Sequence, residues 1–461
     1  MVIAIRPAPE QAKLFTKAAT LPRQIFFFGQ NGGMEHTPLL SRRQIMAGLT
    51  GLAASLPAAT YAQTGALDPT SDADQSGALQ SALHAASTTG RLSLPAGRFR
   101  VSGLRIPGNL LVEGVPGATW LIGMGSMIGA ISAQSNIVLR DIGFVGDSGS
   151  DALFGIEASE AVTLERCLFR DNSGVGLGVR SSAANIQNCG FAGHGDAAIH
   201  AMDNKGLLIS GNRITRCGNA GIRVWRSEQG VDGSIVTNNI ISSIDWRGGG
   251  NGQNGNGINV YLADEVVVSG NHIADCAFTA VRLNTTRNSV VSNNQCRNSG
   301  EVAIFSEFGF SGSIIAQNLV DGAATGISIT NLDVGGSLAV CTGNIVRNIF
   351  PSSKVNPDTI PIGIFAEADT AITSNVVENV PGVAIGAGWG PYLRNVAVSG
   401  NVVRNSTIGI GISIADGAGA VSVSGNQVDS TENAIVGMRW TEIAEPDLSA
   451  VIDRYPQVSI D

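Results

Sequence analysis

Charged, polar and aromatic side chains recur at two fixed positions of a repeated pattern that fills most of the chain. Each repeat contains a short strand that begins with an inward aliphatic residue, from Ile156 in the first aligned repeat to Ile435 in the last, and the two positions follow it by one and three residues. Because side chains alternate along a strand, both rows should point outward on one face. The first row is Glu157, Gly178, His200, Arg223, Asn259, Arg282, Phe305, Ser328, Phe365 and Gly386. The second row is Ser159, Arg180, Met202, Trp225, Tyr261, Asn284, Glu307, Thr330, Glu367 and Gly388.

The middle of these rows carries groups that could modify an acidic polysaccharide. Elimination or epimerisation at a uronate needs a base for the proton next to the carboxylate, and positive charge for the enolate that forms. Arg282 and Arg223 are the candidates for the positive charge, and Tyr261 or His200 for the proton transfer. Substitution of Arg282 by alanine should then stop turnover and leave the fold intact.

Hydrolysis of a glycan would instead need two carboxylic acids that flank the bond. Asp245 and Glu307 are the nearest candidates. Sugar rings stack on aromatic side chains, and arginine holds a uronate carboxylate through two parallel hydrogen bonds. The substrate-binding candidates are Trp225, Asn259, Asn284, Arg180 and Trp246. The rows therefore favour a protein that binds an acidic polysaccharide and could modify it, as a uronate lyase or a glycan hydrolase.

Loop lengths indicate the same part of the chain. The usual step from the second apolar residue of a repeat to the next aligned aliphatic residue is seven or eight residues, but it is 17 before Ile258 and 18 before Ile364. Insertions at one corner of a solenoid form a wall beside one face, which is often the binding face. Within the first insertion, Asp245, Trp246 and Arg247 should stand beside the two rows.

A second interpretation assigns no chemistry to these rows. Every outward row of a solenoid must be filled by something soluble, so the alternative is a non-catalytic glycan-binding or envelope-associated module. No cofactor is evident, and calcium is left open although the rows lack the clustered carboxylates of calcium sites. The net charge of −8 and the lack of a basic stretch argue against nucleic acid as a partner.

Each repeat has an Asn slot with an apolar residue three positions before it and another two positions after it, and the pattern recurs about every 25 residues. Short β-branched runs between Gly, Asn, Asp and Ser predict strands and turns. Three short strands cannot bury their inward side chains alone, but stacked coils can, which predicts a parallel β-helix of about twelve or more coils. Leucine-rich repeats are the main rival, and their pattern is absent. The Asn slot holds Ile142, Cys167, Cys189, Asn212, Asn239, Asn271, Asn294, Asn318, Asn344, Asn375, Asn401 and Asn426.

Units of the type Ser-Gly-Asn-x-Ile and Gly-Ile-x-Val, as at residues 269–273, resemble the right-handed parallel β-helix proteins of the pectate-lyase-like superfamily. The resemblance covers about residues 68–440 and implies a right-handed, single-stranded β-helix with an N-terminal capping helix. The chain departs from the superfamily's catalytic signatures. Polygalacturonases pair Asp-Asp with Gly-His-Gly, and here only the Gly-His-Gly around His194 is present. The Asp-Pro-His of mannuronan epimerases is absent.

Residues 41–62 have the parts of a twin-arginine signal: Arg42 and Arg43, a short apolar stretch, and a cleavable Thr-Tyr-Ala. With this signal, the chain resembles a family of twin-arginine-exported β-helix repeat proteins that has no established activity. The signal implies the twin-arginine export machinery as a partner and a periplasmic or secreted location. The apolar stretch is too short for a stable membrane anchor. Translation is expected to start at Met34.

The six cysteines are expected to be buried thiols, because they occupy apolar positions of the repeat. Cys167 and Cys189 are the pair that could bridge neighbouring coils. His194 occupies the same repeat position as Cys217 and Cys276, five residues after the Asn slot, which favours a structural histidine.

Four segments are expected along the chain: a leader over 1–62, an N-terminal cap and first coils over 63–122, the repeats over 123–440, and a C-terminal cap over 441–461. The N-terminal cap should include a helix with Leu79, Ala82, Leu83 and Ala86 on one face. Asp74 or Ser76 is expected as its N-cap. A monomer is expected.

Overall fold

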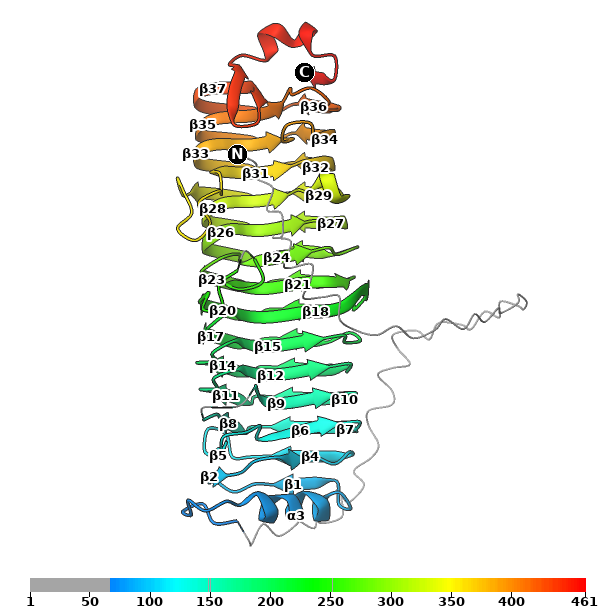
Figure 1. Cartoon of the computed structure of the whole chain (residues 1–461), viewed down its shortest axis with the longest axis vertical. Helices are drawn as coiled ribbons and strands as arrows, with labels where there is room; N and C mark the ends of the chain where they lie inside the picture. The colour runs from blue at the N-terminus through cyan, green and yellow to red at the C-terminus, as the bar shows by residue number, and fades with distance from the viewer. Residues whose placement is uncertain (1–66, 148, 150, 251) are drawn as a thin grey trace, which may run out of the picture. The chain divides into compact units, whose positions relative to one another are not determined.

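The computed structural model describes residues 67–147, 149, 151–250 and 252–461. Over these residues the chain is an all-β, right-handed parallel β-helix, which confirms the fold predicted from the repeat (Figure 1). One strand of each coil joins a 15-stranded sheet, and the remaining strands form a 24-stranded sheet. Strands of successive coils pair in parallel, residue for residue, which places equivalent positions of the repeat in rows.

The 15-stranded sheet forms one side of the helix. Its strands are β1 (Arg91–Ser93), β4 (Leu110–Glu113), β7 (Ser135–Arg140), β10 (Glu160–Glu165), β13 (Ala184–Gln187), β16 (Leu208–Ser210), β19 (Ile235–Thr237), β22 (Val267–Ser269), β25 (Val290–Ser292), β27 (Ser311–Ala316), β29 (Ser337–Thr342), β32 (Ala368–Thr373), β34 (Arg394–Ser399), β36 (Val421–Ser424) and β39 (Val458–Ile460).

The 24-stranded sheet contains two stacks of strands. The first stack is β2 (Gly97–Arg100), β5 (Thr119–Ile122), β8 (Gly143–Val145), β11 (Leu168–Arg170), β14 (Gly190–Ala192), β17 (Arg213–Cys217), β20 (Ile240–Ile244), β23 (His272–Cys276) and β30 (Ile345–Ile349). The second stack is β3 (Leu104–Arg105), β6 (Gly129–Ser132), β9 (Ala152–Glu157), β12 (Val175–Arg180), β15 (Ala197–Met202), β18 (Ala220–Val231), β21 (Asn256–Asp264), β24 (Val281–Asn284) and β31 (Ile362–Ala366). Long strands join both stacks: β26 (Gln295–Glu307), β28 (Leu319–Ile329), β33 (Val376–Ala387), β35 (Val402–Ser413) and β37 (Gln427–Arg439). We call the outer surface of the second stack, with its continuation in the long strands, the site face.

A ladder of buried asparagines runs through the bend before the first stack. From Asn212 to Asn401, each side-chain amide donates to the Oδ1 atom of the asparagine in the next coil at 2.9–3.0 Å, and Asn426 is the last acceptor. Each amide also donates to a backbone carbonyl of the preceding coil, as Asn294 does to Val268 at 2.9 Å. The ladder satisfies buried polar groups that the bend would otherwise leave unpaired.

The interior is apolar and closely stacked. Phe144, Phe169 and Phe191 stack in three successive coils, with ring centroids 4.9 and 4.7 Å apart. All six cysteines are buried and free, including Cys167 and Cys189, which confirms the prediction of packed thiols. His194 is 1% exposed, and burial lowers its pKa to about 4, as expected for a structural residue.

Each end of the coil stack is closed by a segment outside the repeat (Figure 1). Helix α3 (Ser76–Ala86) buries Leu79, Leu83 and Ala86 against the first coils. The expected N-caps were wrong: the helix is preceded by Gln75, which makes no capping side-chain bond, and the Asp74 carboxylate accepts from the Ser76 N–H at 2.8 Å.

At the other end, β38 (Glu442–Glu445) pairs antiparallel with β37, and the 3-10 helix η2 (Ser449–Arg454) leads into β39. A shorter 3-10 helix, η1 (Leu332–Val334), lies in the link between β28 and β29. No helix in the described part of the chain is long and apolar enough to cross a membrane.

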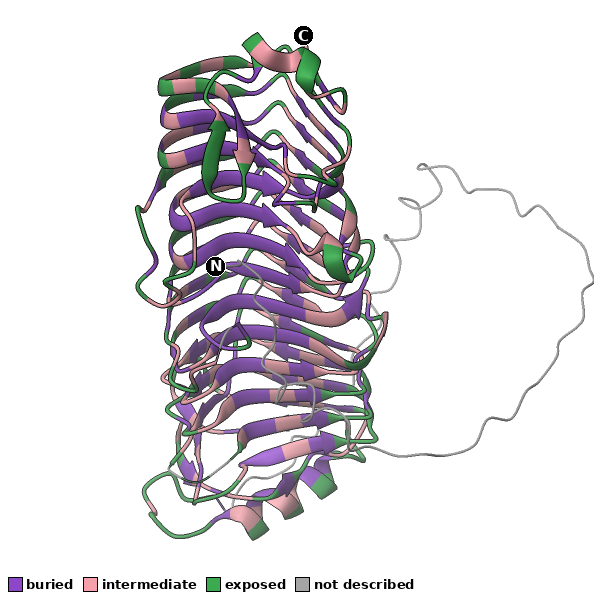
Figure 2. Ribbon diagram, turned by 45° about the horizontal axis from the view of Figure 1, so that its top comes forward, coloured by how far each residue is buried: buried purple, intermediate pink, exposed green. Residues whose placement is uncertain are grey.

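Burial along the central strands departs from simple alternation. In β21, β26 and β28, runs of consecutive residues are buried, and Figure 2 shows long purple bands on the central coils. A solenoid strand buries alternate residues in the core, so consecutive burial means that its outer side is also covered. The cover lies over the two predicted rows.

Candidate functional site

The structure brings the central members of both predicted rows into register on the site face. His200, Arg223, Asn259, Arg282 and Phe305 are paired in that order on neighbouring strands. Arg180, Met202, Trp225, Tyr261, Asn284 and Glu307 form the second row in the same way.

The start of the rows was predicted wrongly. Phe154, and not Ile156, aligns with Leu177, so Gly155 pairs with Gly178 and Glu157 pairs with Arg180. The predicted alignment of this strand was displaced by two residues. A displacement of two keeps inward residues inward and outward residues outward, but it places the wrong outward residue in each row.

Arg282 is the centre of a buried ionic cluster. Its guanidinium makes two bonds to the Glu307 carboxylate, at 2.6 and 2.8 Å, and one to Glu301 Oε2 at 2.9 Å. The three side chains are at most 3% exposed. Asn284 donates to Glu307 at 2.9 Å, and Thr279 donates to Glu301 at 3.1 Å. The Nε, Nη1 and Nη2 atoms of Arg282 therefore all donate to carboxylates of the protein itself.

The cluster carries one more acidic group than basic groups. Burial raises the pKa of Glu307, and Arg282 opposes that rise without cancelling it. Burial would lower the pKa of Arg282, but Glu307 and Glu301 together hold it above its usual value. Arg282 therefore stays charged, and the arrangement is a structural ion pair.

The two insertions cover this cluster. Gly252 lies against the Arg282 guanidinium, where a Cβ atom would come within 2.5 Å of Cζ, so only glycine fits. From the second insertion, Asn356 donates to Glu301 Oε1 at 2.8 Å, and Ser353 donates to the Gly300 carbonyl at 2.6 Å. The insertions were predicted to stand as walls beside the rows, and here they also fold over them.

Arg223 is likewise paired within the protein. Its guanidinium makes two bonds of 2.9 Å to Asp196 and a third of 2.9 Å to Asn254 Oδ1 in the first insertion. Burial raises the pKa of Asp196, but the Arg223 bonds outweigh it and the pKa is lowered overall. Arg223 is 5% exposed. Neither buried arginine presents a free guanidinium to a ligand.

Next to Arg223, His200 is half-buried and remains neutral at pH 7. Burial and the nearby Arg223 lower its pKa to about 4. Its Nδ1 atom lies 3.4 Å from the Arg223 Nη1 atom, which can only donate. A hydrogen bond from Arg223 to Nδ1 places the proton of the neutral His200 ring on Nε2, where it is a donor and not a base.

Trp225 and Tyr261 form an aromatic pair in the second row. Both are half-buried, and their rings meet edge to face with centroids 5.9 Å apart. The Trp225 indole N–H donates to Asn259 Oδ1 at 3.1 Å, which fixes the ring on the face. Burial raises the pKa of Tyr261, so its phenol is protonated at neutral pH.

The remaining predicted residues lie apart from this pair. Asp245 is exposed on the first insertion, where Arg247 pairs with it at 3.0 Å. Trp246 packs on Phe278 with ring centroids 5.0 Å apart and donates to the Gly250 carbonyl at 3.0 Å. Asp245 and Glu307 thus have different partners and different burial, and they do not form an acid pair. Arg180 is exposed.

Three acidic residues of the site were missed as candidates. Asp196 and Glu301 both stand three residues before an aligned aliphatic residue, Ile199 and Ile304, and each faces an arginine of the adjacent coil. This shared position was a readable signal. Glu367 was placed in the second row but assigned no role; it is 7% exposed, and burial raises its pKa to about 7.

Glu367 should give the protein a measurable dependence of stability on pH. Its folded pKa of about 7 lies above the ordinary value of 4.5, so the folded state holds the proton more tightly. The protonated Glu367 contributes about 3 kcal/mol to the free energy of unfolding. This contribution is full below about pH 4.5 and is lost as the pH rises through 7. Glu367→Gln, which can still accept from the Leu332 N–H, should flatten urea-measured stability between pH 5 and 8. Parallel curves for the two proteins would contradict this.

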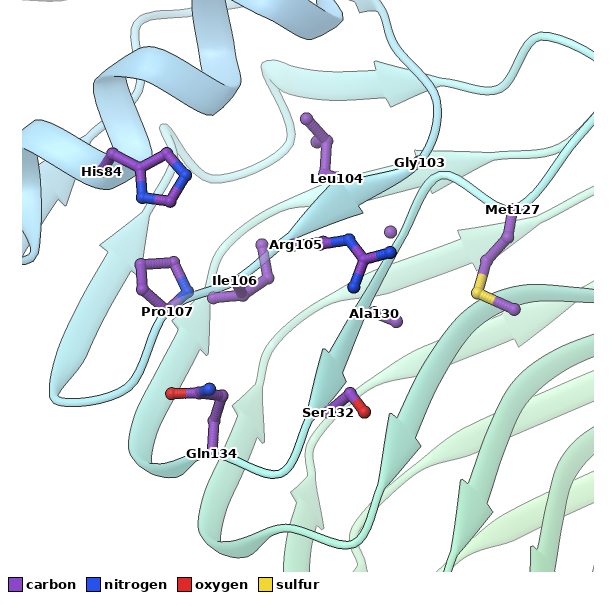
Figure 3. Close-up of a pocket in the computed structure, with 11 residues that line it drawn as sticks. His84, Gly103, Leu104, Arg105, Ile106, Pro107, Met127, Ala130, Ser132 and Gln134 are labelled. Atoms are coloured by element: carbon purple, nitrogen blue, oxygen red, sulfur yellow. The ribbon is translucent and has the colours of Figure 1, made fainter.

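A cavity of about 470 Å³ opens at the N-terminal end of the site face. Figure 3 shows His84 of α3 on one side of it, Ser132 and Gln134 on another, and the Arg105 side chain extending toward Ala130. From Ala130 the first row continues through Gly155 and Gly178 to His200. A Cβ atom added to Gly178 would meet no atom nearer than 3.6 Å, so the space above this glycine is open. Gly155 and Gly178 therefore form a glycine floor between the cavity and His200. We call this path from the cavity to Asn284 the trough.

No group of three or more His, Cys, Asp or Glu side chains within the described ranges is placed to hold a metal ion. The signal residues Arg42 and Arg43 lie outside the described residues.

Comparisons with known proteins agree with the fold. A family model for the right-handed β-helix region matches residues 134–250 and 226–335. No curated protein has a significantly similar sequence. The N-terminal fragment of bacteriophage phi29 gene product 12 is similar in structure, with a TM-score of 0.58 and 14% identity over 84% of this chain and 73% of that one.

Two further solved structures are similar at low identity. The enzymatically active domain of bacteriophage CBA120 tailspike protein 2 has a TM-score of 0.50 and 11% identity over 65% of this chain, which spans half of that domain's length. The A-module of the Azotobacter vinelandii mannuronan C-5 epimerase AlgE4 has a TM-score of 0.44 and 16% identity over 84% of this chain and 96% of that one. The family model and the phage structures together identify the described part of the chain as a right-handed parallel β-helix.

Proposed function

We propose that the protein binds an extended acidic polysaccharide along the trough of the site face. The observation that carries the proposal is the continuous register from the cavity at Arg105, through the glycine floor, to the half-buried pair Trp225 and Tyr261. The whole trough, from β3 to Asn284 in β24, crosses eight strands of the second stack, or about 34 Å at the spacing of a sheet. A path of this length suits a chain of sugars better than a small molecule.

The aromatic pair supplies the apolar contact that sugar rings need. Trp225 is held by Asn259 and by its edge contact with Tyr261, so little side-chain entropy is lost when a ligand binds. Met202, one strand before Trp225, extends the apolar strip toward the glycine floor. The Nε2 proton of His200 lies beside this strip as a hydrogen-bond donor.

Two exposed arginines along the trough favour an acidic ligand, and they outnumber the one exposed carboxylate among the described residues of its two rows, Glu157, which lies on the strand next to that of Arg180. Arg105 and Arg180 are exposed, and neither has an ion-pair partner among the residues that the structure describes. Free guanidinium groups bind carboxylates through paired hydrogen bonds. Arg223 and Arg282, the arginines first assigned to this task, are occupied by Asp196, Glu301 and Glu307.

Chemical modification of the polysaccharide is the second candidate function. Of the six residues proposed as catalytic, Tyr261 and His200 are accessible from the trough, and a protonated phenol beside a bound glycan can donate a proton. The buried carboxylates give hydrolysis no support.

The test is a binding panel with the full chain, acidic and neutral polysaccharides, and rising salt. We expect saturable binding to an acidic polysaccharide that weakens with salt, and about a tenfold loss of affinity for each of Arg105→Ala and Arg180→Ala. Equal binding to neutral glycans would contradict the acidic specificity, and no saturable binding would contradict the proposal. Unsaturated uronates or new reducing ends in the same mixtures would favour the second candidate.

A further inference from the structure

The outer surface of the 15-stranded sheet carries two stripes of uncharged side chains. The first stripe is aliphatic and lies in register on successive coils: Leu208, Ile235, Val267, Val290, Ile314 and Val340. It continues as alanine in β32 and β34. Ile235, Ile314 and Val340 are 43, 45 and 40% exposed, so the stripe faces solvent.

A stripe of small, mostly hydroxyl side chains runs beside the aliphatic one. Two residues further along each strand stand Thr237, Ser269, Ser292, Ala316, Thr342 and Thr373. Some of these hydroxyls already bond to each other, as Thr373 does to Thr342 at 3.1 Å. From β16 to β34 neither stripe contains a charged residue. We call this surface, over β16–β34, the neutral face.

The first stack shows what an ordinary outer face of this helix contains. There Arg297, Asp321, Arg347, Glu378 and Arg404 alternate in sign on neighbouring coils. Two pairs of neighbouring residues form ion pairs: Arg347 with Asp321, and Arg404 with Glu378. Charges therefore suit an outer face of this fold. On the neutral face the described strands carry one such ion pair, Arg394 with Asp369 at the start of β34 and β32, and the two stripes themselves are uncharged over eight coils.

We propose that the neutral face is the surface through which two copies of the chain associate. The net charge of −8 opposes the approach of two copies by most routes. Two uncharged stripes, beside the ion pair of Arg394 and Asp369 whose charges cancel, reduce that repulsion at the contact. Flat sheets pack face to face about 10 Å apart with interdigitating side chains. A two-fold axis would place the same stripes of both copies against each other.

The area of the neutral face is sufficient for a stable dimer. Eight coils span about 34 Å, and the two stripes with their flanking turns span about 20 Å, so each copy would bury about 700 Å². Specific interfaces bury about 600–1,000 Å² per partner, so this area falls within their range. The face lacks the aromatic rings and free guanidinium groups of the trough, so it does not suit the same polysaccharide. Dimerisation would replace the monomer expected from the sequence.

Sedimentation of the full chain between about 1 and 100 µM tests this proposal. We expect a species of twice the 47.4 kDa chain mass, and at least about a tenfold higher midpoint of dimerisation for Ile314→Lys, which sets like charges near the centre of the contact. The matched control is Ile345→Lys, because Ile345 is also 45% exposed but lies on the first stack. A mixture of Ile314→Lys and Ile314→Glu should recover the dimer.

Two results would overturn the proposal. One is a monomer at every concentration for the unaltered chain. The other is a dimer that Ile345→Lys weakens as much as Ile314→Lys does.

Discussion

Substitution of Arg282 by alanine is expected to destabilise the fold by about 3–5 kcal/mol, the cost of removing one partner of a buried ion pair. Glu301 and Glu307 would lose their counter-ion, and both are almost fully buried. The packed insertions leave little room for water to replace the guanidinium, since Gly252 lies directly against it. The loss of stability should appear in urea unfolding at neutral pH.

The pH dependence of that loss separates the ionic cause from a packing defect. Without Arg282, the two carboxyl groups can relieve their repulsion only by binding protons, so the variant should lose less stability at pH 5 than at pH 8. Removing all three charges, with Arg282→Met, Glu301→Gln and Glu307→Gln together, should restore much of the stability.

The exposed arginine of the second row provides the control. Arg180→Ala should change stability by no more than about 0.5 kcal/mol, because no buried group depends on it. If Arg282→Ala instead left stability unchanged and stopped a polysaccharide reaction, the catalytic role first assigned from the sequence would be correct.

The coil architecture could be predicted from the sequence because its signals are local and repeated. Apolar residues three before and two after the Asn slot recur in each repeat, and the asparagines themselves bond from coil to coil. The alternation along each strand then fixes which residues face outward, so His200, Arg223 and Arg282 were correctly placed in one row. The same alternation did not detect the shift of two residues at Ile156, because it leaves inward residues inward.

What covers the rows could not be predicted in the same way. The insertions do not follow the repeat, so the sequence shows how long they are but does not predict where their backbone runs. Asn254 and Asn356 reach across to Arg223 and Glu301, and these contacts convert expected ligand-binding charges into internal ion pairs. Arg223 and Arg282 each also pair with an acid of the preceding or following coil, three residues before that coil's aligned aliphatic residue, so the pairing spans the repeat boundary. The residues of the site were therefore identified more reliably than their roles.

The second large effect is expected at the aromatic pair of the trough. Trp225→Ala and Tyr261→Ala should each weaken polysaccharide binding about tenfold, and together about a hundredfold, as buried aromatic anchors commonly contribute 1–2 kcal/mol or more. Both side chains are half-buried at the surface, so stability should fall far less than it does for Arg282→Ala. Trp440→Ala is the control, because Trp440 is 40% exposed but lies at the C-terminal end, outside the trough.

The most direct measurement is the affinity of the full chain and of the Trp225→Ala, Tyr261→Ala double variant for the acidic polysaccharide that the panel identifies, with unfolding curves for both. A loss of about a hundredfold in affinity with the fold retained, and no loss for Trp440→Ala, is the predicted result. Equal affinity of the double variant and the unaltered chain would show that the glycan binds elsewhere, and would contradict the assignment of the trough.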